Sequence, residues 1–365
     1  MKKVMLDQMI LTTCCPTNAG SRMLDGYTSP FAATVAEKLS EKYEIAGKAP
    51  VGEFAIDLVG ESSFDGAADT AAALKSGDAE AVVCLDVNGA PRRIAAQQGL
   101  VFIKPTYGIV SRFGTVPVAC SGECVGVMAK TVADCREILG DMVGKDERDG
   151  TMHADEVCNS ALNTSPVKKV AVLKMDGAES AEMAAAKAQM AANGVEICEI
   201  DAGVIAAANA AWNMLMCAEL CNNVSRYDGV KYGYRTKNYR NLDELYTNSR
   251  TEAFGLLLKT AILYGSDVLS TKNYMSKYDK AMRVRRVVSE AFAKIFAEFD
   301  AVLLPAVSKM AYTAEDCAFA ENKYTAPAHM AGLPAVVAAG VQVMGPAFSD
   351  GKLLALAALL AKEGK

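Results

Sequence analysis

The sequence predicts an α/β protein, and three features of the chain carry this prediction. Two short apolar runs, Ala81–Leu85 and Gly99–Ile103, have the length and composition of buried strands, with a glycine turn and a short helical stretch between them. A second strand–helix–strand unit over residues 165–200 suits a parallel crossover. With 365 residues, 51% of them hydrophobic, the chain is long enough to bury a sizeable core.

Periodicity and capping predict the remaining elements. We expect helices at residues 29–46, 67–76, 180–193, 274–298 and 353–361, and strands at residues 45–48, 165–176, 194–200 and 301–305. A further helix should begin after Thr131, because its side-chain oxygen can accept a hydrogen bond from a free N–H of the first turn.

The turn between the first two strands contains the most informative residues of the chain. Asn88 and Gly89 tolerate positive φ, so the backbone can turn sharply after Val87 and present its N–H groups on one side. A strand-to-helix turn of this kind can form an oxyanion hole. The residue that should carry the chemistry is Ala90, however, and its side chain has no nucleophilic atom.

This stretch resembles the signature of the amidase signature family. The family motif runs glycine-serine-aspartate-threonine-glycine-glycine-serine, then an arginine two residues on, and then a strand ending in leucine-lysine-proline-threonine-tyrosine-glycine. The matching residues here are Cys84, Leu85, Asp86, Val87, Asn88, Gly89, Ala90, Arg92, Lys104, Pro105, Thr106, Tyr107 and Gly108. The backbone frame of the motif is kept, and the nucleophilic serine is replaced.

The resemblance implies a relay of one lysine and two serines, in which the neutral lysine deprotonates the nucleophile through a bridging serine. The lysine position matches Lys48, the bridging position matches Gly66, and the nucleophile position matches Ala90. Ser62 and Ser63 lie four and three residues before the bridging position and could replace it only if the loop is rebuilt. Two of the three relay members are therefore absent.

A lysine left without its relay must deprotonate, reach solvent or pair with an acid, because an unpaired buried ammonium is costly. We expect Lys48 to be solvated or paired with Asp65 or Asp86.

Within the family, the chain resembles most the A subunits of the glutamyl-tRNA(Gln)/aspartyl-tRNA(Asn) amidotransferases. The matching stretches are residues 225–235, 250–255 and 265–270. By this resemblance, the substrate's carboxylate-binding arginine pair falls at Thr260 and Ala261, and the aspartate that binds the substrate's amino group falls at Asn322. All of these charged anchors are lost. The tyrosine- and arginine-rich loop at 225–235 is either a binding surface or the covering of a helical insertion.

The resemblance implies an amidase-signature α/β/α sandwich around a mixed β-sheet, compacted by N-terminal and loop deletions. We expect a single domain over residues 1–365, with a helical insertion at residues 202–298. In the helix at 274–298, Arg283, Arg285 and Arg286 could meet RNA or an acidic partner, although a solvated face is the simpler explanation and the one we favour.

Composition excludes several other classes of protein. The net charge of −5 argues against direct nucleic-acid binding by this chain alone. We expect no apolar run to reach the roughly 18 to 20 residues of a membrane span, which favours a cytoplasmic location. Eleven cysteines without metal spacing indicate reduced thiols, and we expect no metal and no cofactor. His153 lies in a polar stretch, and packing against apolar neighbours would explain His329.

The sequence leaves two functions open. The first is a non-catalytic relative of the amidotransferase A subunits, with a binding or assembly role beside B- and C-type subunits or as a homo-oligomer. The second is a working amidase or glutamine amidotransferase that uses a displaced nucleophile, for which Ser62, Ser63, Cys84 and Cys120 are the candidates.

Overall fold

The computed structural model describes residues 1–7, 33–49, 72–231, 233–307 and 321–362. Its centre is a mixed sheet, and within these residues ten strands pair in the order β2-β1-β3-β5-β4-β9-β10-β8-β6-β7. The strands are β1 (Lys3–Asp7), β2 (Glu44–Ala49), β3 (Ala81–Asp86), β4 (Val101–Lys104), β5 (Cys124–Ala129), β6 (Lys169–Lys174), β7 (Glu196–Asp201), β8 (Ala301–Pro305), β9 (Ala335–Ala338) and β10 (Val341–Met344). Both ends of the sheet are parallel, whereas the strands between β3 and β8 pair antiparallel. The predicted mixed α/β architecture is confirmed.

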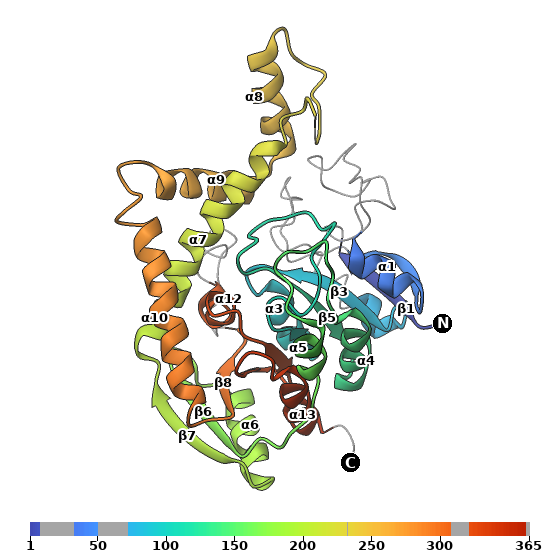
Figure 1. Ribbon diagram of the computed structural model, residues 1–365, viewed down its shortest axis with the longest axis vertical. Helices are drawn as coiled ribbons and strands as arrows, with labels where there is room; N and C mark the ends of the chain where they lie inside the picture. Colours follow the sequence, from blue (N-terminus) through green and yellow to red (C-terminus); the bar gives the residue numbers. More distant parts are fainter. Residues whose placement is uncertain (8–32, 50–71, 232, 308–320, 363–365) are drawn as a thin grey trace.

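Helices cover both faces of the sheet (Figure 1). The α-helices are α1 (Thr34–Ser40), α3 (Ala90–Gln98), α4 (Val132–Met142), α5 (Asp155–Ser160), α6 (Ala181–Ala192), α7 (Ala208–Asn223), α8 (Leu242–Ala253), α9 (Leu256–Leu269), α10 (Tyr278–Phe296), α12 (Ala326–Met330) and α13 (Asp350–Ala361). Short 3-10 helices are η2 (Gly203–Ala207), η3 (Val224–Arg226) and η4 (Glu321–Lys323). Helix α3 packs on one face, against β3, β4, β9 and β10, while α4 and α13 pack on the other.

Strand β3 shows why helices have to cover both faces of the sheet. All six of its residues are buried. Val82 and Cys84 join the cluster that packs against α3, whereas Val83 and Leu85 join the larger core cluster that includes α4. Successive side chains of a strand point to opposite faces, so a fully apolar strand has to be central.

The predicted start of α4 is confirmed, whereas several other predicted boundaries differ from the structure by a few residues. Thr131 caps α4, with its hydroxyl accepting a hydrogen bond from Asp134 N at 3.1 Å. The helix expected over residues 29–46 ends at Ser40 within the described residues, because the chain must extend from Glu44 to pair with β1. Its expected start lies outside the described residues, as does the first half of the helix expected at 67–76. Residues 72–76 are described and helical.

Gly203–Arg226 is a helical run that is long and apolar enough to cross a membrane by length and composition alone. This differs from the sequence expectation, because η2, α7 and η3 follow one another without a break and carry few charged residues. Fifty-six per cent of its apolar window is buried inside the molecule, and α7 packs against α9, α10 and α12. Packing against these helices accounts for its apolar side chains.

Helix α13 docks on the sheet through a buried carboxylate. Asp350, the first residue of the helix, accepts hydrogen bonds from Thr106 N at 2.8 Å and from Thr106 Oγ1 at 2.6 Å. The side chain is fully buried, and burial raises the pKa of Asp350 to about 6 despite these donors.

We expect Asp350→Asn to change how stability depends on pH. A folded-state pKa above the unfolded value stabilises the fold below about pH 4, and that contribution is lost as the pH rises through about 6. Relative to Asp350→Asn, the wild-type free energy of unfolding should therefore fall by about 3 kcal/mol between pH 4 and pH 7. Urea unfolding, followed by the fluorescence of the single tryptophan, Trp212, measures this difference.

Asp300→Asn is the matched control for this prediction. Burial would raise the pKa of Asp300, but Lys352 and the N–H groups of Lys168 and Lys169 outweigh burial and lower it. Its contribution should therefore be present at neutral pH and lost in acid. Equal pH slopes for the two variants would contradict the assignment.

Candidate functional site

The turn after β3 has the geometry that the sequence predicts. Gly89 has φ of 88° and precedes the first residue of α3. A Cβ atom built on Gly89 would lie 2.2 Å from Thr325 Oγ1, so a side chain is excluded by space as well as by conformation. Val87, Asn88 and Gly89 are buried, and Thr325 Oγ1 donates to Asn88 O at 3.1 Å. The turn is thus packed tightly against α12.

Ala90 is the first residue of α3 and follows this turn directly. Its side chain is a half-buried methyl group, so the place that the resemblance assigns to a nucleophile holds no oxygen or sulfur.

A fully buried ion pair stabilises the turn. Arg92 Nε donates to Asp86 Oδ2 at 2.7 Å, and neither side chain has any exposed surface. Gly89 N donates to Asp86 Oδ1 at 2.8 Å, so the same carboxylate holds both the helix and the turn. Burial alone would raise the pKa of Asp86, but the charge of Arg92 outweighs burial and holds it well below its usual range.

The remaining donors of Arg92 reach across the molecule. Its Nη1 donates to Gln342 Oε1 at 2.6 Å and to Thr325 O at 3.0 Å, and its Nη2 lies 2.6 Å from His329 Nε2. Gln342 Nε2 in turn donates to Tyr324 O. A single guanidinium therefore connects α3 to β10 and α12.

His329 belongs to this cluster, which corrects the expectation that apolar packing explains it. Its Nδ1 lies 3.0 Å from Gly122 O, and because a carbonyl oxygen only accepts, Nδ1 must carry the proton. The other nitrogen, Nε2, is then free to accept from Arg92. Burial lowers the pKa of His329 to about 4, so the ring is neutral at pH 7. It stacks on Trp212, with ring centroids 5.2 Å apart and planes 9° apart.

Helix α7 packs directly over the turn. Trp212 Nε1 donates to Val87 O at 3.1 Å. Asn322, which is fully buried, donates to Asn213 Oδ1 at 2.8 Å and to Asn88 Oδ1, and its own oxygen accepts from Asn209. A neutral amide held by three others therefore stands where the resemblance places a charged aspartate.

The other residues predicted from the sequence lie further away or outside the described part of the chain. Lys48 is in β2, where it pairs with Leu6 of β1, whose neighbour on the other side is Val83 of β3. Its backbone is thus two strands from β3, or roughly 10 Å. Thr260 is exposed and Ala261 is buried on α9, which packs against α7. Gly66, Ser62, Ser63 and Asp65 lie outside the described residues.

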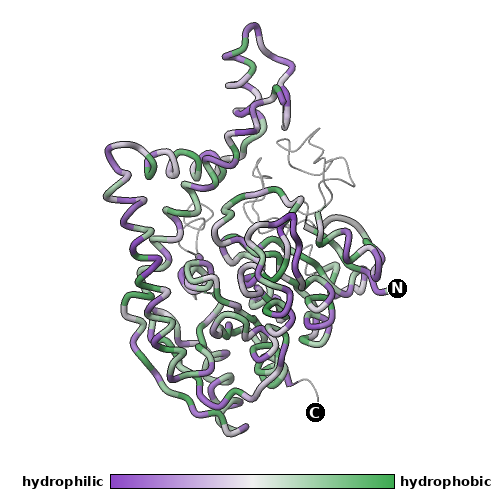
Figure 2. Tube along the Cα trace, viewed as in Figure 1, coloured by the Kyte–Doolittle hydropathy of each residue, from purple (hydrophilic) through white to green (hydrophobic). Residues whose placement is uncertain are grey.

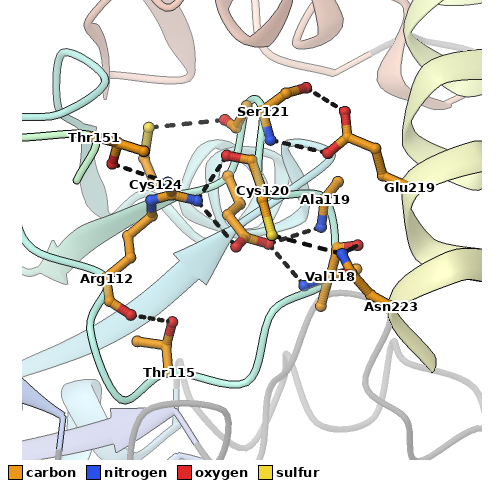
Figure 3. A network of polar contacts seen from close by, with 12 residues as sticks. Arg112, Thr115, Val118, Ala119, Cys120, Ser121, Cys124, Thr151, Glu219 and Asn223 are labelled. Atoms are coloured by element: carbon orange, nitrogen blue, oxygen red, sulfur yellow. Dashed lines mark hydrogen bonds and ion pairs between the residues drawn. The ribbon is translucent and has the colours of Figure 1, made fainter. Parts of the chain in front are cut away.

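Cys120 lies in a loop that a polar network holds in place (Figure 3). Arg112 Nη1 donates to Cys120 O at 2.7 Å and to Glu123 Oε1 at 3.1 Å. Asn223 of α7 lies 3.6 Å from Cys120 Sγ. Burial, followed by the charge of Glu123, raises the pKa of the Cys120 thiol. The thiolate, which is the nucleophilic form, is therefore disfavoured. The other cysteine candidate, Cys84, is buried within β3.

Ser121 connects this loop to two helices. Its N–H donates to Glu219 of α7 at 2.9 Å, as Figure 3 shows. Arg285 of α10 donates to Ser121 Oγ at 2.8 Å and to Ser121 O at 2.6 Å. Arg285 also donates to Met330 O at 2.9 Å, so it is a structural residue and not part of the polar face on which it was predicted.

Sequence reasoning missed Trp212, His329, Arg285 and Gln342 as parts of this site. Each of them has a partner more than 100 residues away along the chain, so no local pattern marks them as parts of one site. The sequence did contain one signal: Arg92 follows a turn expected to be buried, and a buried arginine needs hydrogen-bond acceptors for all of its N–H groups. Among the described residues, no group of three histidine, cysteine, aspartate or glutamate side chains is placed to hold a metal ion.

The fold and the turn together define an amidase-type scaffold. The family model described as "Amidase" matches residues 7–354, and the chain belongs to this family. The glutamyl-tRNA(Gln) amidotransferase A subunit of Acinetobacter baumannii is 33% identical to it, over 93% of this chain and 78% of the relative. The corresponding protein of Symbiobacterium thermophilum is 32% identical, over 95% of this chain and 80% of the relative.

A solved structure agrees with these sequence comparisons. The crystal structure of the glutamyl-tRNA(Gln) amidotransferase A subunit of Thermotoga maritima matches with a TM-score of 0.75 and 27% identity, covering 99% of this chain and 83% of the other. The resemblance noted from the signature motif is thereby confirmed, as is the amidase-signature α/β fold.

Loss of the buried ion pair should destabilise the fold strongly. We expect Asp86→Asn to lower the free energy of unfolding by about 3 to 5 kcal/mol, because it leaves the Arg92 charge buried without a counter-ion. The double variant Asp86→Asn/Arg92→Met should cost less than the sum of the two single changes. Urea denaturation at pH 7 measures both effects.

Glu290→Gln serves as the control, because it breaks an exposed pair with Arg286 on α10. That change should cost no more than about 0.5 kcal/mol. Additive single changes at positions 86 and 92 would show that the pair does not act as a unit.

Proposed function

We propose that this chain is a non-catalytic member of the amidase family, related to the amidotransferase A subunits, with a binding or assembly role. The observation that carries this proposal is Ala90. It lies at the start of α3 immediately after the turn, where the family's nucleophile is expected. A methyl group cannot attack a carboxamide, and in serine hydrolases loss of the nucleophile removes roughly six orders of magnitude in rate.

The surroundings of the turn support the same conclusion. The N–H group of Gly89 already donates to Asp86, so it is not available to an oxyanion in this conformation. Asn322 is neutral and bonded to neighbouring amides, so it offers no carboxylate to a substrate amino group. Thr260 and Ala261 provide no guanidinium. If Lys48 and Gly66 occupy the positions that the resemblance gives them, the lysine has no hydroxyl to activate.

The alternative is an active amidase with a displaced nucleophile, and the described residues give it little support. Cys120 has a raised thiol pKa and no imidazole beside it in its network. Cys84 is buried in the central sheet, where a substrate cannot reach it. Ser62 and Ser63 remain as candidates from the sequence alone.

The relatives suggest which partners to test. They are subunits, and a subunit is by definition a component of a larger assembly. We therefore propose B- and C-type amidotransferase subunits as partners, in the cytoplasm, with residues 202–298 as a helical insertion in one domain.

An ammonia-release assay with glutamine and simple carboxamides tests the proposal. The purified protein should show no turnover above the rate without protein, alone or with added B- and C-type subunits, while an active amidase run in parallel does. Ala90→Ser should also remain inactive, because the bridging serine position and the anchors at 260, 261 and 322 are still missing.

Measurable turnover would contradict the proposal if it is abolished by Cys120→Ala or by the double change Ser62→Ala/Ser63→Ala. Those two variants also identify the displaced nucleophile. Recovery of activity in Ala90→Ser alone would show that the relay is more complete than the residues indicate.

A further inference from the structure

We propose that the helical segment from η2 to α10, residues 203–296, docks on the acidic α/β part of a second copy of this chain. This interaction goes beyond the proposed function, since it does not depend on whether the turn at Ala90 has lost its chemistry. The surface involved is centred on the corner where α9 leads into α10, which projects from the body in Figure 1.

Exposed apolar side chains are concentrated on the helical segment. Of the eleven large hydrophobic residues exposed among the described residues, all except Met1 lie between residues 204 and 287. The ten are Val204, Val230, Tyr239, Leu242, Tyr246, Leu263, Tyr274, Met275, Met282 and Val287. Single exposed apolar residues are ordinary, but their confinement to one segment indicates an interaction site.

We use the name corner surface for four of these residues around the α9–α10 connection: Leu263 on α9, Tyr274 and Met275 in the connection, and Met282 on α10. Leu263 is 71% exposed and Met275 is 64% exposed, which are the two largest values within the segment. Methionine and tyrosine are residue types enriched in protein interfaces. Figure 2 shows hydrophobic and hydrophilic residues interleaved along this part of the chain.

Charge is distributed unequally between the two parts of the molecule. Residues 203–296 contain fourteen lysines and arginines against eight aspartates and glutamates, whereas the whole chain has 38 against 43. The helical segment is therefore basic by six charges and the rest of the chain acidic by eleven. The described residues outside the segment account for five of these eleven, with 21 lysines and arginines against 26 aspartates and glutamates. Such an asymmetry favours contact between the basic part of one molecule and the acidic part of another.

Some basic residues beside the corner surface are available for such a contact. Lys272 and Lys280 are exposed, and neither forms an ion pair with any residue that the structure describes. By contrast, Arg283 pairs with Asp279 and Lys277 pairs with Asp267 on the segment itself. Lys272 and Lys280 flank Met275 along the chain, so an apolar contact and a charged contact can form together.

A second copy of the chain fits this surface better than RNA does. The four side chains of the corner surface are largely apolar, and these gain nothing from a phosphate backbone but do gain from burial against protein. The chain outside the helical segment supplies the excess of acidic side chains that such a contact needs. In a symmetric pair each copy donates one helical segment and one acidic body, so the contact forms twice. Each contact then needs to supply only about half of the roughly 800 Å² per partner that a stable interface buries.

Sedimentation velocity on the full-length protein, across about 1 to 100 µM, tests the proposal. The wild type should show a monomer–dimer equilibrium that weakens when NaCl is raised from about 50 to about 500 mM, because charged contacts are screened. Leu263→Asp/Met275→Asp and Lys272→Glu/Lys280→Glu should each weaken dimerisation by at least about tenfold. Lys75→Glu/Lys130→Glu, two exposed lysines of the α/β part, makes the same change in net charge and should have no such effect.

Three results would overturn the proposal. The first is a wild type that stays monomeric over the whole range at low salt. The second is equal weakening by the control pair, which would indicate a general charge effect. The third is a monomer that retains a labelled bulk tRNA in a gel-shift assay and loses it in Lys272→Glu/Lys280→Glu, which would assign the surface to RNA. The ammonia-release assay is unaffected by each of these outcomes, so failure here is distinguishable from failure of the proposed function.

Discussion

The structure around the turn depends on one interaction, the buried ion pair between Asp86 and Arg92. Asp86 ends β3 and Arg92 lies in the first turn of α3, so the pair sets the angle at which the chain leaves the sheet. With no exposed surface on either group, the carboxylate must find other donors and the guanidinium other acceptors within the protein. Gly89 N satisfies the first need, and Gln342, Thr325 and His329 satisfy the second. The positions of β10 and α12 follow from these contacts.

The helical segment is coupled to the same centre through stacked side chains. Trp212 of α7 lies flat on His329 and donates to Val87 O in the turn, while Arg285 of α10 lies 5.9 Å from the Trp212 ring. Gly122 has to lack a side chain here, because a Cβ would lie 2.3 Å from the Trp212 ring. A displacement of α7 or α10 would therefore change the packing around residues 87–90. A partner that binds the corner surface would contact α10, and α10 packs on α7 beside the turn.

The sequence was sufficient to predict those parts of the fold that depend on neighbouring residues. The Asn88-Gly89 turn, the Thr131 cap and the strand at 301–305 each follow from a local pattern of φ preference, capping or apolar run. The buried network could not be predicted in the same way, because His329 and Asp86 lie 243 residues apart. A histidine flanked by alanine and methionine looks like core packing until the fold brings a carboxylate and a guanidinium to it. The signature motif predicted more than the local patterns did, because its resemblance to a known family assigned each of its residues a position in the fold.

The stability of the turn depends little on which side chain stands at position 90. A serine-to-alanine change at position 90 removes one hydroxyl from a half-buried site, which costs little. Removing either member of the Asp86–Arg92 pair instead leaves a charge buried alone, which costs several kcal/mol, a large share of the stability of a typical domain. Selection for a folded protein alone would therefore keep β3, the glycine turn and α3 in register, whatever side chain stands at position 90. A preserved signature frame reports that the scaffold is stable, and only the atoms at position 90 and its relay partners bear on catalysis.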